Sequence, residues 1–316
     1  MSINQIDVTG HQWQVIANPN ALGKKCLAHW REISDNLESK GIRHELHKAE
    51  GCGQGIETAR RLCQEGKRHL MVVVGDGTIN EVVNGIMQSG VNPNEVFLAV
   101  LPLGRGNDWA RSHRYHKDYG HNLDLFRRGR FIQHDVGVVT TLDGGREINK
   151  RHFINIAGFG FDAEVIYDVV YNRPRFLGIS VYILGLIRAL FGYKSVPVKV
   201  DSGDMQYEGN SFLLVAGLGQ YNGGGIRQVP MAVPDDGNLA VVLIPEVSVF
   251  TILTNFVSMF KGKHIQKIKG IRTCSTARVE IHPSELFRAE VEGELLPTGD
   301  YRIEVIPQAL NVLTGL

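Results

Sequence analysis

The stretch that decides the fold is MVVVGDGTINEVVNGI, residues 71–86. An apolar run ends at Gly75, Asp76, Gly77 and Thr78, and a segment with apolar residues at helical spacing follows. This pattern is typical of a buried strand of a parallel sheet that turns directly into a helix. Because open parallel sheets bind ligands at the carboxyl ends of their strands, the turn is a candidate binding site.

The residue types in this turn favour a phosphate ligand. Its two glycines let the backbone approach closely, and the N–H groups at the start of the helix favour an anion. Thr78 stands three residues before Glu81, the spacing of a capping box, so it is expected to cap the helix. Asp76 would repel a phosphate unless a cation intervenes, which indicates Mg²⁺ and a nucleoside triphosphate. A tight strand-to-helix turn with a capping aspartate explains this one turn equally well.

A second turn of this kind lies in LPLGRGNDWAR, residues 101–111, at the end of another predicted strand. Two glycines flank Arg105, whose guanidinium matches phosphate oxygens, and Asn107 and Asp108 are expected to open a helix. A third glycine turn, residues 18–25, follows the first strand. Three such turns at one sheet edge favour a ligand site over simple chain reversals.

The first third of the chain alternates predicted strands and helices. Strands are expected over residues 13–18, 42–48, 69–75 and 95–104, and helices over residues 24–40, 55–66 and 78–90. This order predicts a parallel sheet with helices on both faces.

From about residue 131 the pattern changes to many strands separated by polar and glycine turns, with helical regions near residues 162–192 and 248–262. Such a pattern is typical of an antiparallel sandwich or barrel-like domain. The expected fold is an α/β nucleotide-binding domain over residues 1–135 and an antiparallel β-sandwich domain over residues 136–301. The last segment, about residues 302–316, is expected to return to the first domain.

The bulk composition excludes few functions. The 316 residues carry a net charge of +1, which gives no argument for a nucleic-acid partner. The four cysteines form no C-x-x-C pair, and no basic segment followed by an apolar one opens the sequence. We therefore expect reduced thiols in a cytoplasmic protein.

The longest apolar stretch, residues 176–193, is interrupted by Gly178, Gly185 and Arg188 and is short for a membrane span. A core helix is the favoured interpretation. The alternative is a helix at a membrane surface, because Arg173, Arg175, Arg188 and Lys194 around it would suit anionic head groups.

These motifs resemble those of the diacylglycerol kinase catalytic-domain family, which includes soluble bacterial lipid kinases and the sphingosine and ceramide kinases. Residues 75–78 are similar to the family's G-G-D-G-T box, and residues 102–108 to its P-x-G-T-x-N-D box. The likeness continues through residues 155–165, 221–244 and 291–313, so it covers nearly the whole chain in family order. NAD kinases share only the first box and a related first domain.

The resemblance implies ATP-dependent phosphorylation of a lipid hydroxyl, with ATP between two domains and Mg²⁺ as the second cofactor. It assigns the general base to Glu292, in the triplet Glu292-Gly293-Glu294. A structural Mg²⁺ would bind Asp236 and the main-chain carbonyl groups of Val233 and Asn238. Asp108 and Asp135 would form an acidic network between that metal and the active site. The implied nucleotide contacts are Asn18, Val74, Gly75, Asp76, Gly77, Thr78, Ile79, Asn80 and Arg105.

Without the resemblance, the turn VPDDGN that carries the implied metal ligands is best explained as a plain β-turn. Three residues also depart from the family motifs. Val74 replaces a glycine, Arg105 a threonine and Glu292 an aspartate. Arg105 would either hold a phosphate or block the nucleotide, and Glu292 can act as a base if its backbone sits about 1 Å further back.

Two other functions stay open. One is a non-catalytic nucleotide- or lipid-binding protein of the same fold, and the other is a kinase of a soluble hydroxyl compound. The expected partners are a lipid substrate and, transiently, the inner face of a membrane, and a homodimer is also left open.

Overall fold

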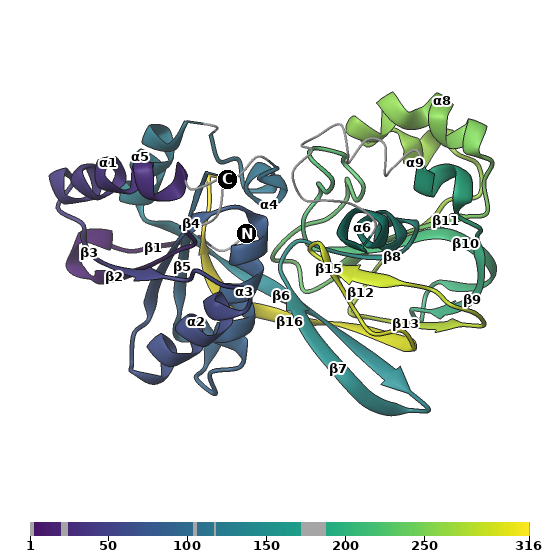
Figure 1. The fold of residues 1–316 in the computed structure, drawn as a ribbon, viewed down its shortest axis with the longest axis horizontal. Helices are drawn as coiled ribbons and strands as arrows, with labels where there is room; N and C mark the ends of the chain where they lie inside the picture. The colour runs from purple at the N-terminus through teal and green to yellow at the C-terminus, as the bar shows by residue number, and fades with distance from the viewer. Residues whose placement is uncertain (1–2, 20–24, 104–105, 117, 172–187, 316) are drawn as a thin grey trace.

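The structure, a computed structural model, describes residues 3–19, 25–103, 106–116, 118–171 and 188–315 (Figure 1). Its strands form one 16-stranded sheet within these residues, and this sheet extends through two lobes. The first lobe contains β1 (Ile3–Gln5), β2 (Gln12–Ala17), β3 (Arg43–Lys48), β4 (His69–Val74) and β5 (Phe97–Pro102). Its helices are α1 (Lys25–Ser39), α2 (Gln54–Gln64), α3 (Asp76–Met87), α4 (Asp108–Ser112) and α5 (Tyr119–Arg128), with short 3₁₀ helices at Val8–Gly10 and Pro93–Glu95.

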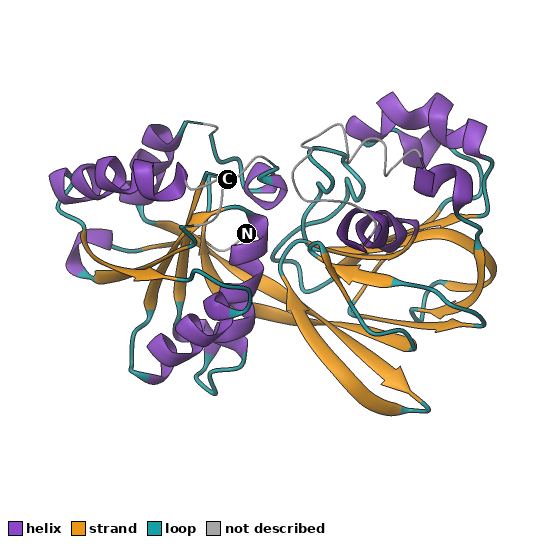
Figure 2. Cartoon of the chain, in the orientation of Figure 1, coloured by secondary structure: helices purple, strands orange, loops and turns teal. Residues whose placement is uncertain are grey.

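The first lobe has the parallel sheet that the sequence predicts. The strands β3, β2, β4 and β5 pair side by side in parallel, and α1 and α5 lie on one face of the sheet while α2 and α3 lie on the other (Figure 2). Leu70, Met71, Val72 and Val73 of β4 are fully buried, because both faces of this central strand are covered.

The second lobe is built from antiparallel strands. They are β6 (Arg130–Asp143), β7 (Arg146–Phe153), β8 (Ile156–Gly160), β9 (Val196–Asp201), β10 (Gln206–Gly217), β11 (Leu239–Pro245), β12 (Arg272–Thr276), β13 (Arg278–Pro283), β14 (Ala289–Val291), β15 (Glu294–Leu295) and β16 (Asp300–Leu313). The helices α6 (Phe161–Tyr171), α8 (Val249–Phe260) and α9 (His264–Lys267) and a helical turn at 188–192 accompany them. The helical region expected near 162–192 is therefore described only at its two ends, since 172–187 lie outside the described residues.

Two long strands connect the lobes. The strands β6 and β16 pair antiparallel from Asp300 opposite Leu142 to Leu313 opposite Phe131, with one irregularity between Ile306 and Leu310. At its carboxyl end β16 also pairs in parallel with β5, and so completes the sheet of the first lobe. Both expected domain boundaries, after residues 135 and 301, fall inside these continuous strands.

The predicted capping box at Thr78 is wrong. The helix α3 begins at Asp76, with Gly75 as its N-cap, so Thr78 already lies in the first turn. Glu81 instead accepts hydrogen bonds of 2.9 Å from the backbone N–H groups of Gly53 and Gly55. The strand β4 is followed directly by α3, and the Glu81 carboxylate holds the start of α2 against α3.

Gly85 should be required for the packing of α2 on α3. A Cβ atom there would collide with the backbone carbonyl of Ile56 and lie 2.8 Å from the Cβ of Ala59. We therefore expect Gly85→Ala to lower the free energy of unfolding by about 1–3 kcal/mol, although alanine is the better helix former. Urea unfolding would measure this.

The control is Gly120→Ala in α5, where the nearest atom outside the adjacent residues, Oδ1 of Asp118, would lie 3.4 Å from the new Cβ. This substitution should be neutral or stabilise the protein by up to about 1 kcal/mol. Equal effects of the two substitutions would contradict the packing argument.

Candidate active site

The site begins where two neighbouring parallel strands end. β4 and β5 are paired as far as Val74 and Pro102, so the loops that follow leave the sheet side by side. Asp76 is the first residue of α3, and Asp108 is the first residue of α4. The backbone N–H of Asp108 donates to Oδ2 of Asp76 over 3.2 Å, which links the two loops directly.

Gly106 allows the carboxylates of Asp76 and Asp108 to lie close together. A Cβ atom at position 106 would lie 3.3 Å from Oδ2 of Asp76 and 3.8 Å from Oδ2 of Asp108. Burial raises the pKa of both carboxyl groups, and the charge of Asp108 raises the pKa of Asp76 further. Oδ1 of each is buried without a hydrogen-bond partner among the described residues. Two such oxygen atoms fit the preference of Mg²⁺ for carboxylate ligands.

A loop of the second lobe contacts Asp108. Oδ2 of Asp108 accepts a hydrogen bond of 2.7 Å from the backbone N–H of Gly224. Gly223, Gly224 and Gly225 have φ angles of 60°, 83° and 114°, which residues with a side chain rarely adopt. Nε of Arg111 lies 3.8 Å from Oδ1 of Asp108. Asp108 therefore joins the two lobes within the site.

Glu292 lies in the turn between β14 and β15, with a left-handed φ of 49°. Its Oε1 atom accepts hydrogen bonds of 2.7 Å from the backbone N–H groups of Ile154 and Asn155. Burial raises the pKa of Glu292 to about 7 despite these two bonds, and the charge of Asp76 also acts to raise it. A fixed carboxyl group that titrates near neutrality has the properties of a general base.

Ile79 and Asn80, two predicted nucleotide contacts, lie behind the loop rather than on its surface, with 2% and 1% exposure. The Asn80 carboxamide donates to the carbonyl of His152 over 2.9 Å and accepts a bond of 2.7 Å from the guanidinium of Arg151. Arg151 also forms an ion pair of 2.6 Å with Glu294. Asn80 thus anchors α3 to β7 and, through Arg151, to the turn that carries Glu292.

The remaining predicted nucleotide contacts stand at the same sheet edge. Gly75, Gly77 and Thr78 are at least partly exposed at the start of α3, and Asn18 directly follows β2, the neighbour of β4. The side chain of Val74 and the whole of Arg105 lie outside the described residues.

The predicted structural metal turn is tied to Asp135 of β6. Oδ2 of Asp135 accepts a bond of 2.7 Å from the backbone N–H of Gly237, and Oδ1 accepts one of the same length from Gln308. Burial raises the pKa of Asp135, and the charges of Asp236 and Asp235 raise it further. Asp135 and the turn at 233–238 thus form one acidic region.

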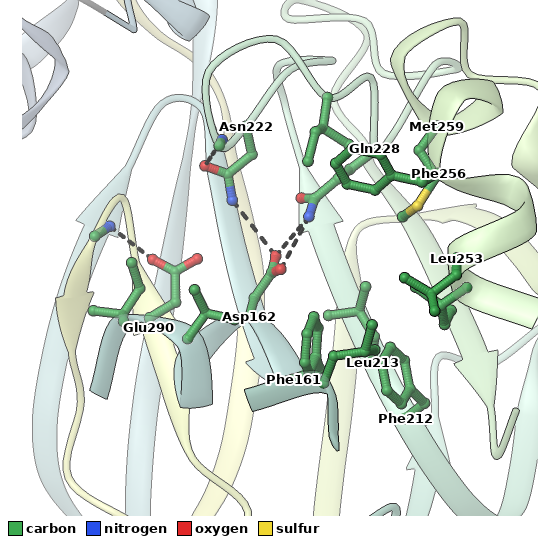
Figure 3. A pocket seen from close by; sticks show the side chains of 17 residues that line it. Phe161, Asp162, Phe212, Leu213, Asn222, Gln228, Leu253, Phe256, Met259 and Glu290 are labelled. Atoms are coloured by element: carbon green, nitrogen blue, oxygen red, sulfur yellow. Dashed lines mark hydrogen bonds between the residues drawn. The ribbon is translucent and has the colours of Figure 1, made fainter. Parts of the chain in front are cut away.

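A cavity of about 260 Å³ in the second lobe adjoins these loops (Figure 3). Helices α6 and α8, the turn at 188–192 and strand β10 supply most of its wall. The apolar side chains that line it are Phe161, Val165, Ile166, Leu190, Phe212, Leu213, Ile226, Ile252, Leu253, Phe256 and Met259. In Figure 3 the polar residues occupy one side of the cavity, and Leu253, Phe256 and Met259 the other.

Two carboxyl groups that the sequence analysis missed form the polar end. Nε2 of Gln228 donates to Asp162 over 2.8 Å, and Glu290 accepts a bond of 2.7 Å from the backbone N–H of Gly293. Gly158 leaves room for both acids, since a Cβ there would lie 2.7 Å from Oε1 of Glu290 and 3.1 Å from Oδ2 of Asp162. Burial raises the pKa of Asp162 to about 6 and that of Glu290, with the added charge of Asp162, to about 8.

The cavity and the acidic cluster share two loops. Gly293 lines the cavity and directly follows Glu292, while Gly223 lines it and directly precedes Gly224, the donor to Asp108. The only hint of this arrangement in the sequence is the run Glu290-Val291-Glu292-Gly293-Glu294, in which acids alternate.

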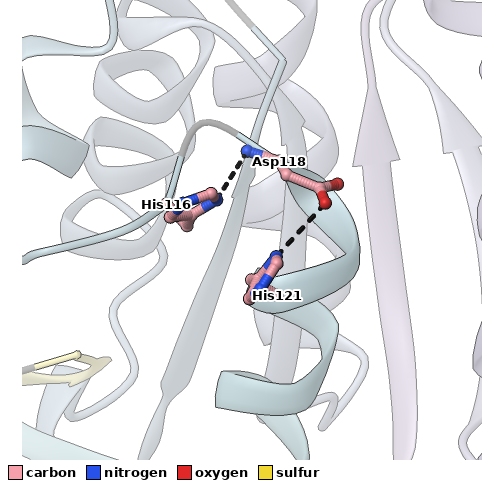
Figure 4. A group of neighbouring side chains, drawn as sticks. All are labelled: His116, Asp118 and His121. Atoms are coloured by element: carbon pink, nitrogen blue, oxygen red, sulfur yellow. Dashed lines mark hydrogen bonds and ion pairs between the residues drawn. The ribbon is translucent and has the colours of Figure 1, made fainter.

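A group of possible metal ligands lies at the start of α5 (Figure 4). The fold brings His116, Asp118 and His121 together, with their ligand atoms within 4.8 Å of one another. All three are exposed. Asp118 caps the helix by accepting from Gly120 over 3.0 Å, and its backbone N–H donates to Nδ1 of His116 over 3.0 Å. These hydrogen bonds account for the proximity of the three side chains as part of the N-cap of α5, without a metal.

Two family models together cover most of the chain. The model described as the diacylglycerol kinase catalytic domain matches residues 12–139. The model described as the YegS C-terminal NAD kinase beta sandwich-like domain matches residues 155–314, about half of the chain.

Individual proteins show the same similarity. The chain is 27% identical over 284 residues to the diacylglycerol kinase of Staphylococcus carnosus, which covers 89% of this chain and 88% of the relative. It is 25% identical to that of Staphylococcus saprophyticus, over 90% and 91% of the two chains. The crystal structure of a diacylglycerol kinase from Bacillus anthracis has a TM-score of 0.71 at 19% identity, over 96% of this chain and 97% of that one. The similarity to the latter shows a shared fold.

Glu290→Gln should change how stability depends on pH. The pKa of Glu290 rises from 4.5 to about 8 on folding, so the folded state binds the extra proton. The wild-type protein should therefore lose stability as pH rises from about 4.5 to 8, because the carboxylate must ionise while buried. The amide of the variant carries no such cost, so at pH 9 the variant should be more stable by on the order of 2 kcal/mol.

Urea unfolding at pH 5 and pH 9 would test this, with the exposed Glu285→Gln as the control. A Glu290→Gln variant that tracks the wild type at both pH values would show that the carboxyl group is not protonated in the folded state.

Proposed function

Because the chain belongs to the diacylglycerol kinase catalytic-domain family, we propose that it is a lipid kinase that transfers the γ-phosphoryl group of ATP to a lipid hydroxyl. Diacylglycerol or a related lipid is the proposed acceptor. The observation that carries this proposal is that an acidic cluster and an apolar cavity meet at one turn, residues 290–293. Glu292 lies beside the acidic loops of the first lobe, while Glu290 and Gly293 line an apolar cavity.

The loop at residues 75–78 and the start of α3 would hold the phosphates of ATP, assisted by Asn18. The partial positive charge at a helix N-terminus favours phosphate, and the exposed Gly77 leaves open space beside the backbone. The Oδ1 atoms of Asp76 and Asp108 accept no hydrogen bond from a described residue and fit Mg²⁺, which would neutralise charge on the triphosphate when bound. Arg105 would add a further cation to the phosphates.

Glu292 would accept the proton of the lipid hydroxyl. Its two bonds to backbone N–H groups fix the carboxyl group, and a pKa of about 7 leaves a large part of it ionised at neutral pH. The glutamate side chain is longer than that of the aspartate in the family motif. The left-handed backbone at Glu292 directs this longer side chain differently from the way an extended strand would. Rate would come mainly from positioning the hydroxyl oxygen in line with the phosphoryl group.

The cavity supports a lipid over a soluble hydroxyl compound. Most of its lining is apolar, which suits acyl chains, and its polar residues gather at one end, where a head group would lie.

The turn at Val233, Asp236 and Asn238 would hold a structural Mg²⁺, with Asp135 linking it to β16. Within the described residues no helix combines the length and hydrophobicity needed to cross a membrane. We place the enzyme at the cytoplasmic face of a membrane.

Glu292→Gln should reduce turnover by about 10²–10⁴-fold, because the amide cannot accept the hydroxyl proton. Its carbonyl oxygen can still accept the bonds from Ile154 and Asn155, so the fold and ATP affinity should persist. Transfer of ³²P from ATP to diacylglycerol in mixed micelles, with calorimetric titration of ATP, measures both. Glu285→Gln, an exposed neighbour, should keep full activity. Undiminished turnover in the Glu292 variant would remove this residue from the base role.

Asp76→Asn should abolish the dependence of ATP binding on Mg²⁺. The affinity of the variant for Mg·ATP should fall at least about tenfold, because the substitution removes a carboxylate ligand of the hard cation. It should bind metal-free ATP as well as or better than the wild type, because a carboxylate beside the phosphates has been neutralised.

Titration of ATP with and without Mg²⁺ would show this, with the exposed Asp143→Asn as the control. Equal losses in both titrations would mean that Asp76 supports the loop rather than a metal.

A further inference from the structure

The helix α8 is apolar on two faces. Its inner face contributes Ile252, Phe256 and Met259 to the wall of the cavity, and Leu253, at the boundary of the two faces, lines the cavity as well. Its outer face exposes Phe250 (74%) and Val257 (71%), and Leu253 (49%) and Phe260 (42%) are exposed along the same stripe. These four residues are spaced by three, four and three positions, which places them in one row along the helix. A row of exposed apolar side chains of this size marks an interaction surface.

The segment that follows this row is basic. Lys261, Lys263, Lys267 and Lys269 are all exposed, and none of them forms an ion pair with a residue that the structure describes. No aspartate or glutamate occurs anywhere from residue 247 to residue 279. Figure 1 shows α8 and α9 together along the upper edge of the second lobe. An apolar row beside unpaired lysines is the pattern of a helix that lies in an anionic membrane surface.

A further exposed aromatic side chain, Phe191, lies next to a residue of the cavity wall. In the turn at 188–192 Leu190 lines the cavity, and the next residue, Phe191, is 68% exposed. The sequence analysis considered residues 173–194 as the membrane contact, and of these the described residues begin at Arg188, which is exposed. The apolar pattern of residues 249–260 is equally typical of a core helix, so the sequence alone does not indicate an exposed face there.

We propose that the outer row of α8 (Phe250, Leu253, Val257 and Phe260) and the four lysines after it dock on an anionic lipid bilayer. The apolar row enters the boundary between head groups and acyl chains, and the lysines contact the anionic head groups. Since the inner face of the same helix lines the cavity, docking brings the bilayer within one helix diameter, about 10 Å, of the cavity. A second copy of the chain fits this face less well, because two such faces would bring eight lysines together.

Vesicle binding tests the proposal on the full chain without ATP. We would measure co-sedimentation with vesicles of pure phosphatidylcholine and of equimolar phosphatidylcholine and phosphatidylglycerol. The wild type should bind the anionic vesicles at least tenfold better, and this preference should weaken as salt is added. Phe250→Ser with Val257→Ser, or Lys→Gln at all four lysines, should lower binding to anionic vesicles at least tenfold. The control, Ile148→Ser with Lys150→Gln on the exposed hairpin of β7, should bind like the wild type.

Two outcomes would overturn the proposal. One is wild-type binding that neither variant reduces, or no binding at all. The other is a dimer, seen by sedimentation, that the Phe250 and Val257 substitutions dissociate, since the face would then be a self-association surface.

Docking of α8 on a bilayer does not depend on the proposed function. Only the step in which a lipid of that bilayer is phosphorylated rests on the proposed function. Neither Phe250 nor Val257 lines the cavity, so both variants should phosphorylate a water-soluble short-chain diacylglycerol at the wild-type rate and lose activity only on vesicles. A chain that binds anionic vesicles as expected but phosphorylates neither form of the lipid would refute the proposed function and leave the docking surface standing.

Discussion

The arrangement of the site depends on how Asp135 holds the bend between the lobes. β6 and β16 run side by side through both lobes, and their pairing is irregular only between Ile306 and Leu310. Gln308, inside that irregularity, has a φ of 50°, and its N–H is held by Oδ1 of Asp135 while Oδ2 holds Gly237. One buried carboxylate therefore fixes the kink in β16 and the 233–238 turn at the same time. In this arrangement Asp108 reaches the second-lobe loop, where the N–H of Gly224 donates to it.

The site concentrates negative charge where the fold alone would avoid it. Burial raises the pKa of Asp76, Asp108, Asp162, Glu290 and Glu292, and several of these groups raise one another's further. Among the described residues, the cation that approaches Asp108 is Arg111, and it stays 3.8 Å away. Such clustering costs stability, and unpaired buried carboxyl groups are characteristic of sites that meet a cation or a substrate. Among the described residues, nothing donates a hydrogen bond to Oδ1 of Asp76, Oδ1 of Asp108 or Oε1 of Glu290, so a ligand at either place would relieve this cost.

The sequence predicted those features that depend on local pattern. The parallel sheet followed from the apolar runs and their spacing, and the proximity of Asp76 and Asp108 followed from their turns ending neighbouring strands. Features that depend on distant contacts were not predictable. Glu81 has the spacing of a capping box, yet its partners are glycines of α2. The apolar residues of α8 point both ways, and sequence alone cannot tell a cavity wall or an exposed row from a core.

The turn from Val291 to Glu294 is where the two lobes' contributions become one site. The chain leaves β14 with Glu290 directed to the cavity, and the left-handed conformation at Glu292 turns the next acidic side chain toward Ile154, Asn155 and the loop of Asp76. On the proposed function, a lipid would reach this turn from the cavity and ATP from the first lobe. Phosphoryl transfer requires the hydroxyl oxygen and the leaving oxygen to lie on opposite sides of the phosphorus. On that proposal, a turn approached from two sides meets the requirement. The left-handed φ of Glu292 itself comes from the fold, because Glu292 and Gly293, with φ angles of 49° and 89°, are the two loop residues of the β14–β15 hairpin, and such tight turns need a positive φ at both positions.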